Sequence, residues 1–263
     1  MTDPLDEIGF LAGSANRIEV LRTLTDGAYT RRELGEVVDA SQPTIGRVLN
    51  DLTERNWITY DGDTYRATAT GALVEAGITD LRDRVATEMR LRDIVEWLPT
   101  DVIDVDLRAF RDVTITTPTG TRPNAPIQRM VQLIEETDEV LLLSHSFNQQ
   151  KLDTIHARTI DGALTTKGVF GADAIDAVSE TPRLRKRLRE VVASDAAEIR
   201  ATTETVPAAV EVTDDRTHLL LRDEEGVVQA SMDTDDGAVR SWAIEFHGRY
   251  WEGATPVEPG DLV

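Results

Sequence analysis

Residues 14–68 predict three short amphipathic helices and a hairpin, and the tight turn between the second and third helices limits the fold more than any other feature. Thr30 and Glu33 form a capping box at the start of the second helix. Ser41 caps the third helix, and Pro43 lies in its first turn, where the missing N–H costs little. Roughly three or four residues separate the two helices, which is the spacing of a helix-turn-helix and too short for a bundle of long helices.

Two β-favouring triplets follow the third helix. Ile58–Tyr60 and Thr64–Arg66 flank Asp61–Asp63, whose Asp-Gly step specifies a short hairpin. Helix, helix, helix and hairpin follow one another in the order of a winged helix. We therefore predict a winged helix-turn-helix domain over residues 1–69.

This segment also resembles a known group of proteins. Residues 41–58, SQPTIGRVLNDLTERNWI, are similar to the recognition helix and wing entry of archaeal winged-helix regulators of the ArsR/MarR type. Residues 68–71, TATG, resemble the threonine-x-x-glycine step with which those regulators start their next helix. The resemblance implies a DNA-binding transcriptional regulator.

The third helix of a winged helix enters the major groove of double-stranded DNA, so its exposed side chains are the candidate readers. Arg47 has the donors for guanine and Gln42 the amide for adenine, while Gly46 permits a close backbone approach. The predicted DNA-binding residues are Thr30, Arg31, Arg32, Ser41, Gln42, Thr44, Gly46, Arg47, Asn50, Tyr65 and Arg66. A winged helix used for protein interaction is the alternative, but an outward face of arginine and amides favours DNA.

Residues 70–98 predict one long helix that links the two domains. Apolar residues recur along it at spacings of three and four, and these are Val74, Ile78, Leu81, Val85, Met89, Ile94 and Trp97. Such a stripe is buried against the chain's own domains or against a second helix. Its place between domains favours a helix that forms a homodimer or transmits a signal.

Residues 99–263 alternate strand and helix patterns. A strand over 139–144, a helix over 148–160 and a strand over 163–170 form a βαβ unit. Further strands are predicted over 198–203, 208–212, 217–221 and 227–232, with helices opening at Thr181-Pro182 and spanning 236–252. The expected fold is a two-domain chain of class α+β and α/β, whose C-terminal sheet is mixed and whose last helix is aromatic and belongs to the core.

The C-terminal domain resembles, in three places, the archaeal regulators named for the methanogenesis regulatory protein. The similar stretches are residues 160–175, IDGALTTKGVFGADAI, the Leu221–Gly226 hairpin, and residues 241–246, SWAIEF. That resemblance implies a fold related to phospholipase D, which the sensor half of TrmB-type sugar regulators shares. It therefore implies a domain that senses a small-molecule effector.

Ligands of open α/β sheets collect beyond the carboxyl ends of the strands. Here that rule points to Ser144, His145 and Ser146 after one strand and to residues 168–171 after the next. With Arg158, the three residues 144–146 are the predicted ligand-binding set. Loop residues satisfied by the backbone are the alternative reading.

A phospholipase D nucleophile needs histidine-x-lysine with an aspartate farther on, because the lysine holds the phosphate that the imidazole attacks. Residues 156–158 and 247–249 read His-x-Arg and lack that pattern, and the serine-elbow, Walker and dinucleotide glycine motifs are missing. We expect no enzyme and no cofactor. The sequence has no cysteine, which excludes thiolate metal sites, and we expect no metal.

The chain has 48 acidic and 28 basic residues, a formal charge of −20, and arginine far exceeds lysine. That bias resembles proteins of salt-in halophiles and describes a surface suited to molar salt. No signal peptide or membrane span is evident, so we expect a cytoplasmic protein. Residues 183–189 form the one basic cluster; a solvated or ion-paired helix face is expected there, with a second DNA contact or an anion site as alternatives.

The interpretation that unites these features is a homodimeric transcriptional regulator that binds DNA and senses an effector. Two other classes stay open: a protein-interaction adapter of the transcription machinery, and a phosphodiesterase-like hydrolase with an accessory winged helix.

Overall fold

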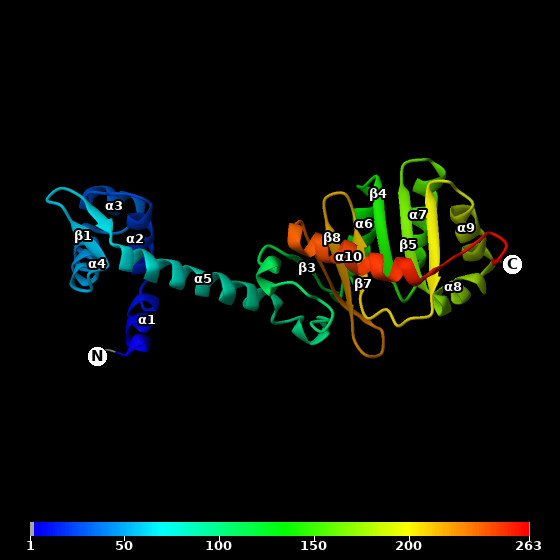
Figure 1. The fold of residues 1–263 in the computed structure, drawn as a ribbon, viewed down its shortest axis with the longest axis horizontal. Helices are drawn as coiled ribbons and strands as arrows, with labels where there is room; N and C mark the ends of the chain where they lie inside the picture. The colour runs from blue at the N-terminus through cyan, green and yellow to red at the C-terminus, as the bar shows by residue number, and fades with distance from the viewer. Residues whose placement is uncertain (1–2, 263) are drawn as a thin grey trace. The chain divides into compact units, whose positions relative to one another are not determined.

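The computed structural model describes residues 3–262, and the chain divides into two compact units between Ala86 and Thr87. Figure 1 shows the first unit in blue and cyan and the second in green to red. Helix α5 (Ala69–Leu91) runs across the division. None of the helices in the described residues is long and apolar enough to cross a membrane.

The first unit packs four short helices, a two-stranded sheet and the start of α5 around one apolar core. Its elements are α1 (Pro4–Ala12), α2 (Ala15–Asp26), α3 (Arg31–Val37), α4 (Gln42–Glu54), β1 (Ile58–Tyr60) and β2 (Tyr65–Ala67). The predicted capping box of Thr30 and Glu33 is confirmed, and Ser41 accepts from the backbone N–H of Thr44 at the start of α4. The sequence did not predict α1, whose single buried residue is Leu11.

Residues 68–71 connect the hairpin to α5 and hold the two together. The Thr68 hydroxyl accepts from the Gly71 N–H and donates to the Asn56 carbonyl. A Cβ on Gly71 would lie 1.9 Å from the carbonyl oxygen of Trp57. Only glycine permits this contact, because the neighbouring atom belongs to the backbone and has little room to move.

The second unit is built on an eight-stranded mixed sheet of order β10-β6-β5-β4-β7-β8-β9-β3. The three parallel strands β4, β5 and β6 lie together, and the other pairs are antiparallel. The strands are β3 (Thr114–Thr116), β4 (Glu139–Ser144), β5 (Thr165–Gly171), β6 (Ala197–Thr202), β7 (Ala209–Val212), β8 (Thr217–Arg222), β9 (Val228–Thr234) and β10 (Thr255–Pro256). The predicted βαβ unit and mixed sheet are confirmed.

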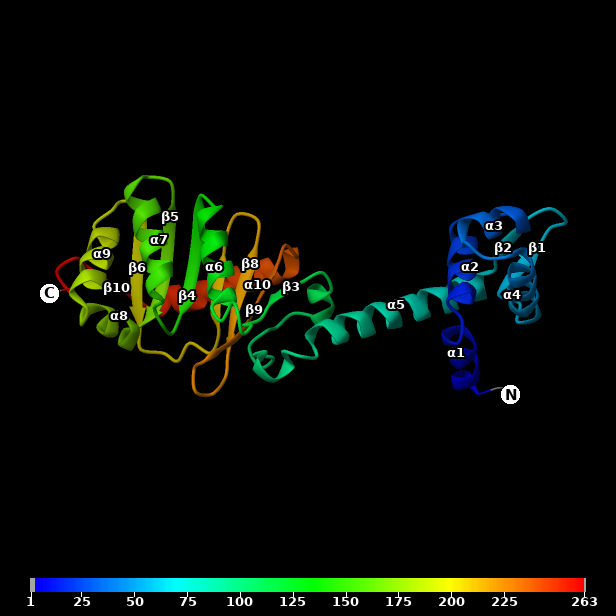
Figure 2. The same cartoon turned by 180° about the vertical axis from the view of Figure 1, so that it is seen from behind.

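Helices cover both faces of this sheet. Helices α6 (Ala125–Glu135), α7 (Gln149–Ile160), α8 (Ala172–Ser179) and α9 (Pro182–Val192) cover one face, as Figure 2 shows from that side. Helix α10 (Gly237–Gly253) crosses the other face, where Trp242 and Phe246 are buried in the largest core cluster. The prediction that the aromatic last helix is a core element is confirmed.

The long helix ends earlier than the sequence predicted. Helix α5 ends at Leu91, and a 3₁₀ turn over Val95–Trp97 follows, whereas the apolar spacing predicted one helix to residue 98. Leu91, Ile94 and Leu98 are all buried in the core of the second unit. The periodicity continues past Leu91 because these residues pack into that core, and the chain turns to bring them there.

Candidate functional site

The outward face of α4 is polar and carries one cation that has no partner among residues 3–262. Its inward residues Ile45, Val48, Leu49 and Leu52 are buried, as their spacing predicts. Gln42, Arg47 and Asn50 are exposed on the opposite side. Within the described residues Arg47 forms neither an ion pair nor a side-chain hydrogen bond, so its guanidinium is available to a partner.

Arg31 lies over the first turn of α4 and occupies the space that Gly46 leaves. Its Nη2 donates to the Gln42 carbonyl at 2.6 Å. A Cβ on Gly46 would lie 2.4 Å from that Nη2. The glycine therefore makes room for an arginine of the neighbouring helix, and the cation adds to the partial positive charge at the amino end of α4. Such an end suits a phosphate.

The remaining predicted DNA-binding residues divide into capping, paired and exposed groups. Thr30, Ser41 and Thr44 are engaged in helix caps. Arg32 forms an exposed ion pair with Glu36, and Arg66 on β2 is exposed without one in the described residues. The Tyr65 ring is half-buried, stacks on Tyr60 at 4.5 Å between centroids, and is positioned by two backbone hydrogen bonds to Tyr29.

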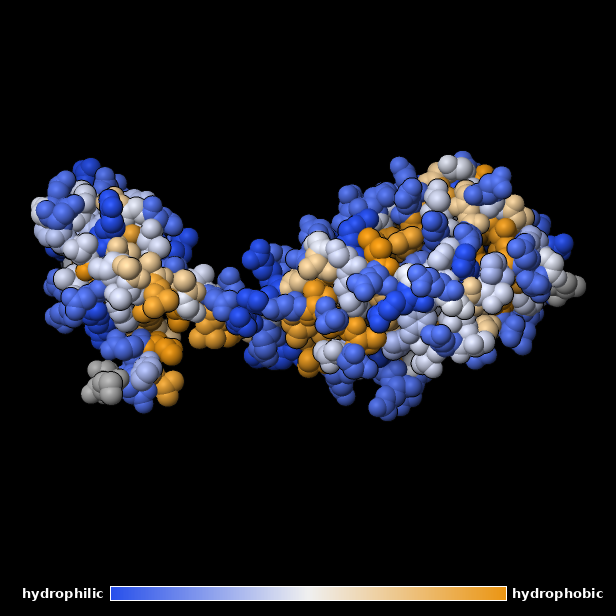
Figure 3. Space-filling model, viewed as in Figure 1, coloured by the Kyte–Doolittle hydropathy of each residue, from blue (hydrophilic) through white to orange (hydrophobic). Residues whose placement is uncertain are grey.

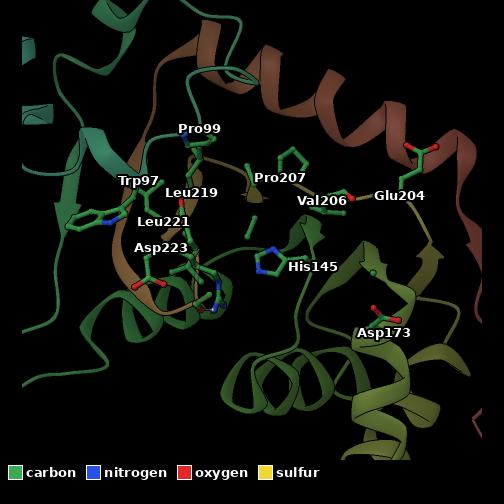
Figure 4. Close-up of a pocket in the computed structure, with 18 of the residues that line it drawn as sticks. Trp97, Pro99, His145, Asp173, Glu204, Val206, Pro207, Leu219, Leu221 and Asp223 are labelled. Atoms are coloured by element: carbon green, nitrogen blue, oxygen red, sulfur yellow. Dashed lines mark hydrogen bonds between the residues drawn. The ribbon is translucent and has the colours of Figure 1, made fainter.

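A second site lies in the C-terminal unit, where a cavity of about 610 Å³ opens at the carboxyl ends of β5 and β6. Figure 4 shows His145 in its centre, with Leu219 and Leu221 on one side and Pro207 and Val206 above. The volume is in the range of sites for metabolites.

Arg222, the last residue of β8, lies in the wall of this cavity beside His145. Its Nη1 donates to the Gly226 carbonyl and its Nη2 to the Ser146 hydroxyl, at 2.7 and 3.2 Å. Its Nε is buried and has no hydrogen-bond acceptor. Burial lowers the pKa of Arg222, which nevertheless stays charged, because arginine is not deprotonated in proteins.

Behind the cavity a row of ionisable side chains crosses the face of the sheet that α6 to α9 cover. Glu211, His218 and Asp233 are register neighbours on β7, β8 and β9. Asp233 accepts a bidentate pair from Arg129 of α6, both N···O distances being 2.9 Å, and a further ion pair from Arg216. This acid is fully satisfied.

The rest of the row has fewer partners. Burial raises the pKa of Glu211, although the nearby ammonium of Lys151 opposes the rise, and both Glu211 oxygens lack hydrogen bonds. Burial lowers the pKa of Lys151, which the positive charge of Arg222 lowers further. Burial lowers the pKa of His218 to about 3, so this imidazole is neutral at physiological pH.

Burial lowers the pKa of His145, and the charges of Arg222 and Lys151 lower it further. Arg222 is thus the cation that gives the cavity wall its positive potential, and the lowered pKa favours a neutral His145 imidazole beside it. The sequence did not predict Arg222 or Lys151 as part of this site. The Leu221–Gly226 hairpin was noted only for its resemblance, and no local pattern connects it with residue 145.

Of the predicted ligand-binding residues, His145 lines the cavity, Ser146 accepts a hydrogen bond from Arg222 in its wall, and Ser144 and Arg158 do not line it. Ser144 is buried and donates to the Ser146 carbonyl, and His145 lines the cavity. The prediction for Arg158 is wrong: its guanidinium donates to the carbonyls of residues 134, 135 and 163 at the amino edge of β4 and β5. A helix between parallel strands returns the chain to that edge, so residues late in α7 lie far from the carboxyl ends.

The other histidines and the basic cluster have local partners or lie in the core. His156 contacts Glu190 on α9 at 2.6 Å, and His247 is one of the buried residues of α10. On α9, Arg187 pairs with Asp153 and Lys186 with Glu190. In residues 3–262 no group of three carboxylates or imidazoles is positioned to hold a metal.

Two family models match the chain. Residues 5–90 match the HVO_A0261 N-terminal domain, and residues 123–253 match the middle domain of the methanogenesis regulatory protein FilR1. The C-terminal unit thus matches a regulatory-protein domain. The first match covers the helices and hairpin of the first unit, and the second covers α6 to α10 with most of the sheet. No curated protein matches the chain.

The similar solved structures are distant. TrmBL2, described as an archaeal chromatin protein with a novel mode of DNA binding, is 18% identical over 96% of this chain and 99% of its own, with a TM-score of 0.42. Nuc from Salmonella typhimurium, a phospholipase D family member, is 9% identical over 56% of this chain and 99% of its own, with a TM-score of 0.43. NucT from Helicobacter pylori is also 9% identical, over 55% and 98%, with the same TM-score. Likeness at this level supports no functional conclusion.

Proposed function

We propose that the protein is a transcriptional regulator whose first unit is a winged helix-turn-helix that binds double-stranded DNA. The observation that carries the proposal is the exposed face of α4, where Arg47 has no partner within the described residues and Arg31 adds a second cation at the helix start. A recognition helix needs that arrangement, because one cation reads base edges and the other holds a phosphate. The match of residues 123–253 to a regulatory-protein domain supports it.

We further propose that the regulator acts as a homodimer, held by an apolar surface on α1 and α5. A groove of about 560 Å³ between these helices is lined by Ile8, Leu11 and Leu81. Figure 3 shows hydrophobic residues gathered there. Leu5, Ile8, Leu81, Val85 and Met89 are exposed by 71%, 44%, 45%, 47% and 61%. A contiguous apolar stripe on a chain this acidic suits a second copy of the same stripe.

The third part of the proposal is that the C-terminal unit senses a small molecule in the 610 Å³ cavity. Trp97, the last residue of the 3₁₀ turn that follows α5, and Pro99 both line it. A ligand that contacts these two residues has a physical route to the linking helix. No catalytic chemistry is proposed, because the histidine-x-lysine pattern of phospholipase D is missing from the sequence.

The deciding experiment is genome-wide mapping of bound DNA, followed by affinity measurements on the recovered operator. Arg47→Ala should weaken specific binding by about 5- to 150-fold, since a bidentate base contact contributes about 1–3 kcal/mol. Arg82→Ala, an exposed arginine on α5, is the matched control and should change little. Equal affinity of the Arg47 variant and the parent chain would remove α4 as the reader.

A further inference from the structure

An arginine without an acidic partner in the described residues lies in the wall of the C-terminal cavity and limits what the cavity can bind. Arg222 is half-buried in its wall, and among the described residues no carboxylate pairs with it. By contrast, the half-buried Arg129 and Arg216 both pair with Asp233. Arg222 is instead held by two neutral oxygens, those of Gly226 and Ser146, and its Nε is left without an acceptor.

We propose that this cavity binds a small organic anion, a carboxylate or a phosphate monoester with an apolar body, whose charged group is held by Arg222 and His145. The proposal rests on the sensing role proposed above and names the chemical class of the effector. An anion would give the buried Nε its missing acceptor and replace the neutral oxygens with a charge-assisted contact, which is the stronger kind of hydrogen bond.

The positive potential at this wall has a structural source. Lys151 is 4% exposed behind His145, and Arg222 and Lys151 both act on the His145 imidazole. Burial disfavours the charged forms of both members of the neighbouring pair, because it raises the pKa of Glu211 and lowers the pKa of Lys151, whereas Arg222 stays charged. An incoming anion therefore meets the charge of Arg222, which pairs with no carboxylate in the described residues, in a partly desolvated place where attraction is less screened than at the surface.

Acidic residues also line the cavity, but they lie at its rim or are already engaged. Asp173, Glu204, Glu224 and Glu225 are exposed, so water and salt screen them. Asp223 accepts from the Val227 N–H and from Gln229 within its own turn. This rim disfavours ligands with several negative charges, such as nucleoside triphosphates, and leaves room for one anionic group at the wall.

The rest of the lining selects an apolar body. Val206, Pro207, Leu221 and Trp97 surround the space beside His145 in Figure 4. A ligand bound to Arg222 would extend its carbon skeleton over these side chains. Burial of that skeleton would supply most of the affinity, and the anionic group would supply the specificity.

The test uses the full-length chain in potassium chloride and a fixed set of probes. Benzoate, hexanoate and phenyl phosphate are compared with their neutral counterparts benzamide, hexanamide and phenol by ligand-observed NMR and thermal shift. At least one acid should bind saturably, and its neutral counterpart should bind at least tenfold more weakly. Preference for benzoate and hexanoate, or for phenyl phosphate, decides between a carboxylate and a phosphate ligand. If no acid binds, or if the neutral compounds bind as well, the proposal is wrong.

Substitutions test whether the acid binds at Arg222. Arg222→Gln should weaken the acid by at least tenfold and Arg222→Lys by less, because a point charge remains. Arg240→Gln on α10 is the matched control, since Arg240 is also half-buried with no ion pair in the described residues. Undiminished acid binding by a folded Arg222→Gln chain would overturn the assignment.

Failure of the anion site can be distinguished from failure of the proposed DNA-binding function. DNA binding without probe should be equal in Arg222→Gln and the parent chain, because Arg222 lies in the other unit. If the chain binds acids through Arg222 but no DNA, the regulator proposal fails and the anion site stands. If it binds DNA but no acid, the anion site fails alone.

Discussion

Arg31 and Gly46 form a complementary pair across α3 and α4: the guanidinium of one lies where the side chain of the other would be. The sequence suggested that Gly46 lets the DNA backbone approach, whereas in the folded unit it admits an arginine. The positive charge on the first turn of α4 thus depends on a glycine that need not touch DNA itself.

Gly46→Ala tests this relationship. The added methyl group would displace the flexible end of Arg31 from its place over α4, and the fold should survive, because alanine favours a helix over glycine by about 0.5–1 kcal/mol. If Arg31 holds a phosphate, affinity should fall to a similar extent on operator and random DNA. Fluorescence anisotropy on both duplexes checks it, with Arg31→Ala beside it. A loss confined to the operator would instead place Gly46 against the bases.

The Gly71 contact predicts a strong effect on stability. Gly71→Ala would put a methyl group 1.9 Å from the Trp57 carbonyl oxygen, so the hairpin and α5 must separate. We expect a loss of at least about 2 kcal/mol in the free energy of unfolding of the first unit, in the upper range for overpacking. Gly248→Ala in α10 is the control, because a Cβ there meets nothing within 4 Å and should not destabilise. Denaturant titration followed by tryptophan fluorescence measures both.

Local patterns predicted most of the elements because these segments are self-sufficient. The capping box predicts the start of α3 and the apolar run predicts β4, and neither prediction needs distant residues. Helix α6 was not predicted: its apolar residues follow a loop over 117–124 that is rich in threonine and proline, and its N-cap residue Asn124 makes no side-chain capping hydrogen bond.

The cavity was only half predictable, for a topological reason. His145 directly follows β4, so the rule for strand ends could place it, but Arg222 ends β8, which lies two places away in the sheet order. The Arg158 prediction failed because it ignored the direction of α7. Strand order depends on packing between distant segments, and the local patterns of a single sequence do not predict it.

The apolar stripe on α5 predicts a dimer that a single charge should break. Leu81→Glu would place a carboxylate in the groove against α1, and we expect the chain to sediment as a monomer in molar potassium chloride. Leu107→Glu is the control, because Leu107 is exposed by 40% in the other unit. A parent chain that is monomeric at all accessible concentrations would contradict the prediction, as would a Leu81→Glu chain that still dimerises.

The neutral, buried His218 predicts how stability depends on acid. Its pKa is about 3 in the folded chain and about 6.5 when unfolded, so the unfolded state binds more protons between these values and stability falls as pH decreases from about 6.5. His218→Gln removes this contribution, and its loss of stability between pH 7.5 and 5 should be smaller by about 2 kcal/mol. His156→Gln is the control on an ion-paired histidine of α7. Equal pH slopes in His218→Gln and the parent chain would show that His218 is not held neutral.

The charge of −20 predicts an unusual salt dependence of DNA binding. At about 1 M salt the Debye length is roughly 3 Å, so acids beyond the contact shell hardly repel the duplex, while direct contacts of Arg31, Arg47 or Arg66 persist. An ordinary basic binder loses affinity with a slope of about −0.9 per phosphate contact in a plot of log affinity against log salt. Here few cations meet phosphate and repulsion grows on dilution, so the slope should be much shallower and positive at low salt. Operator affinity measured from low to multimolar potassium chloride decides this. A steep monotonic loss would reveal a basic surface beyond α4, with Arg183 to Arg189 on α9 as the first place to substitute.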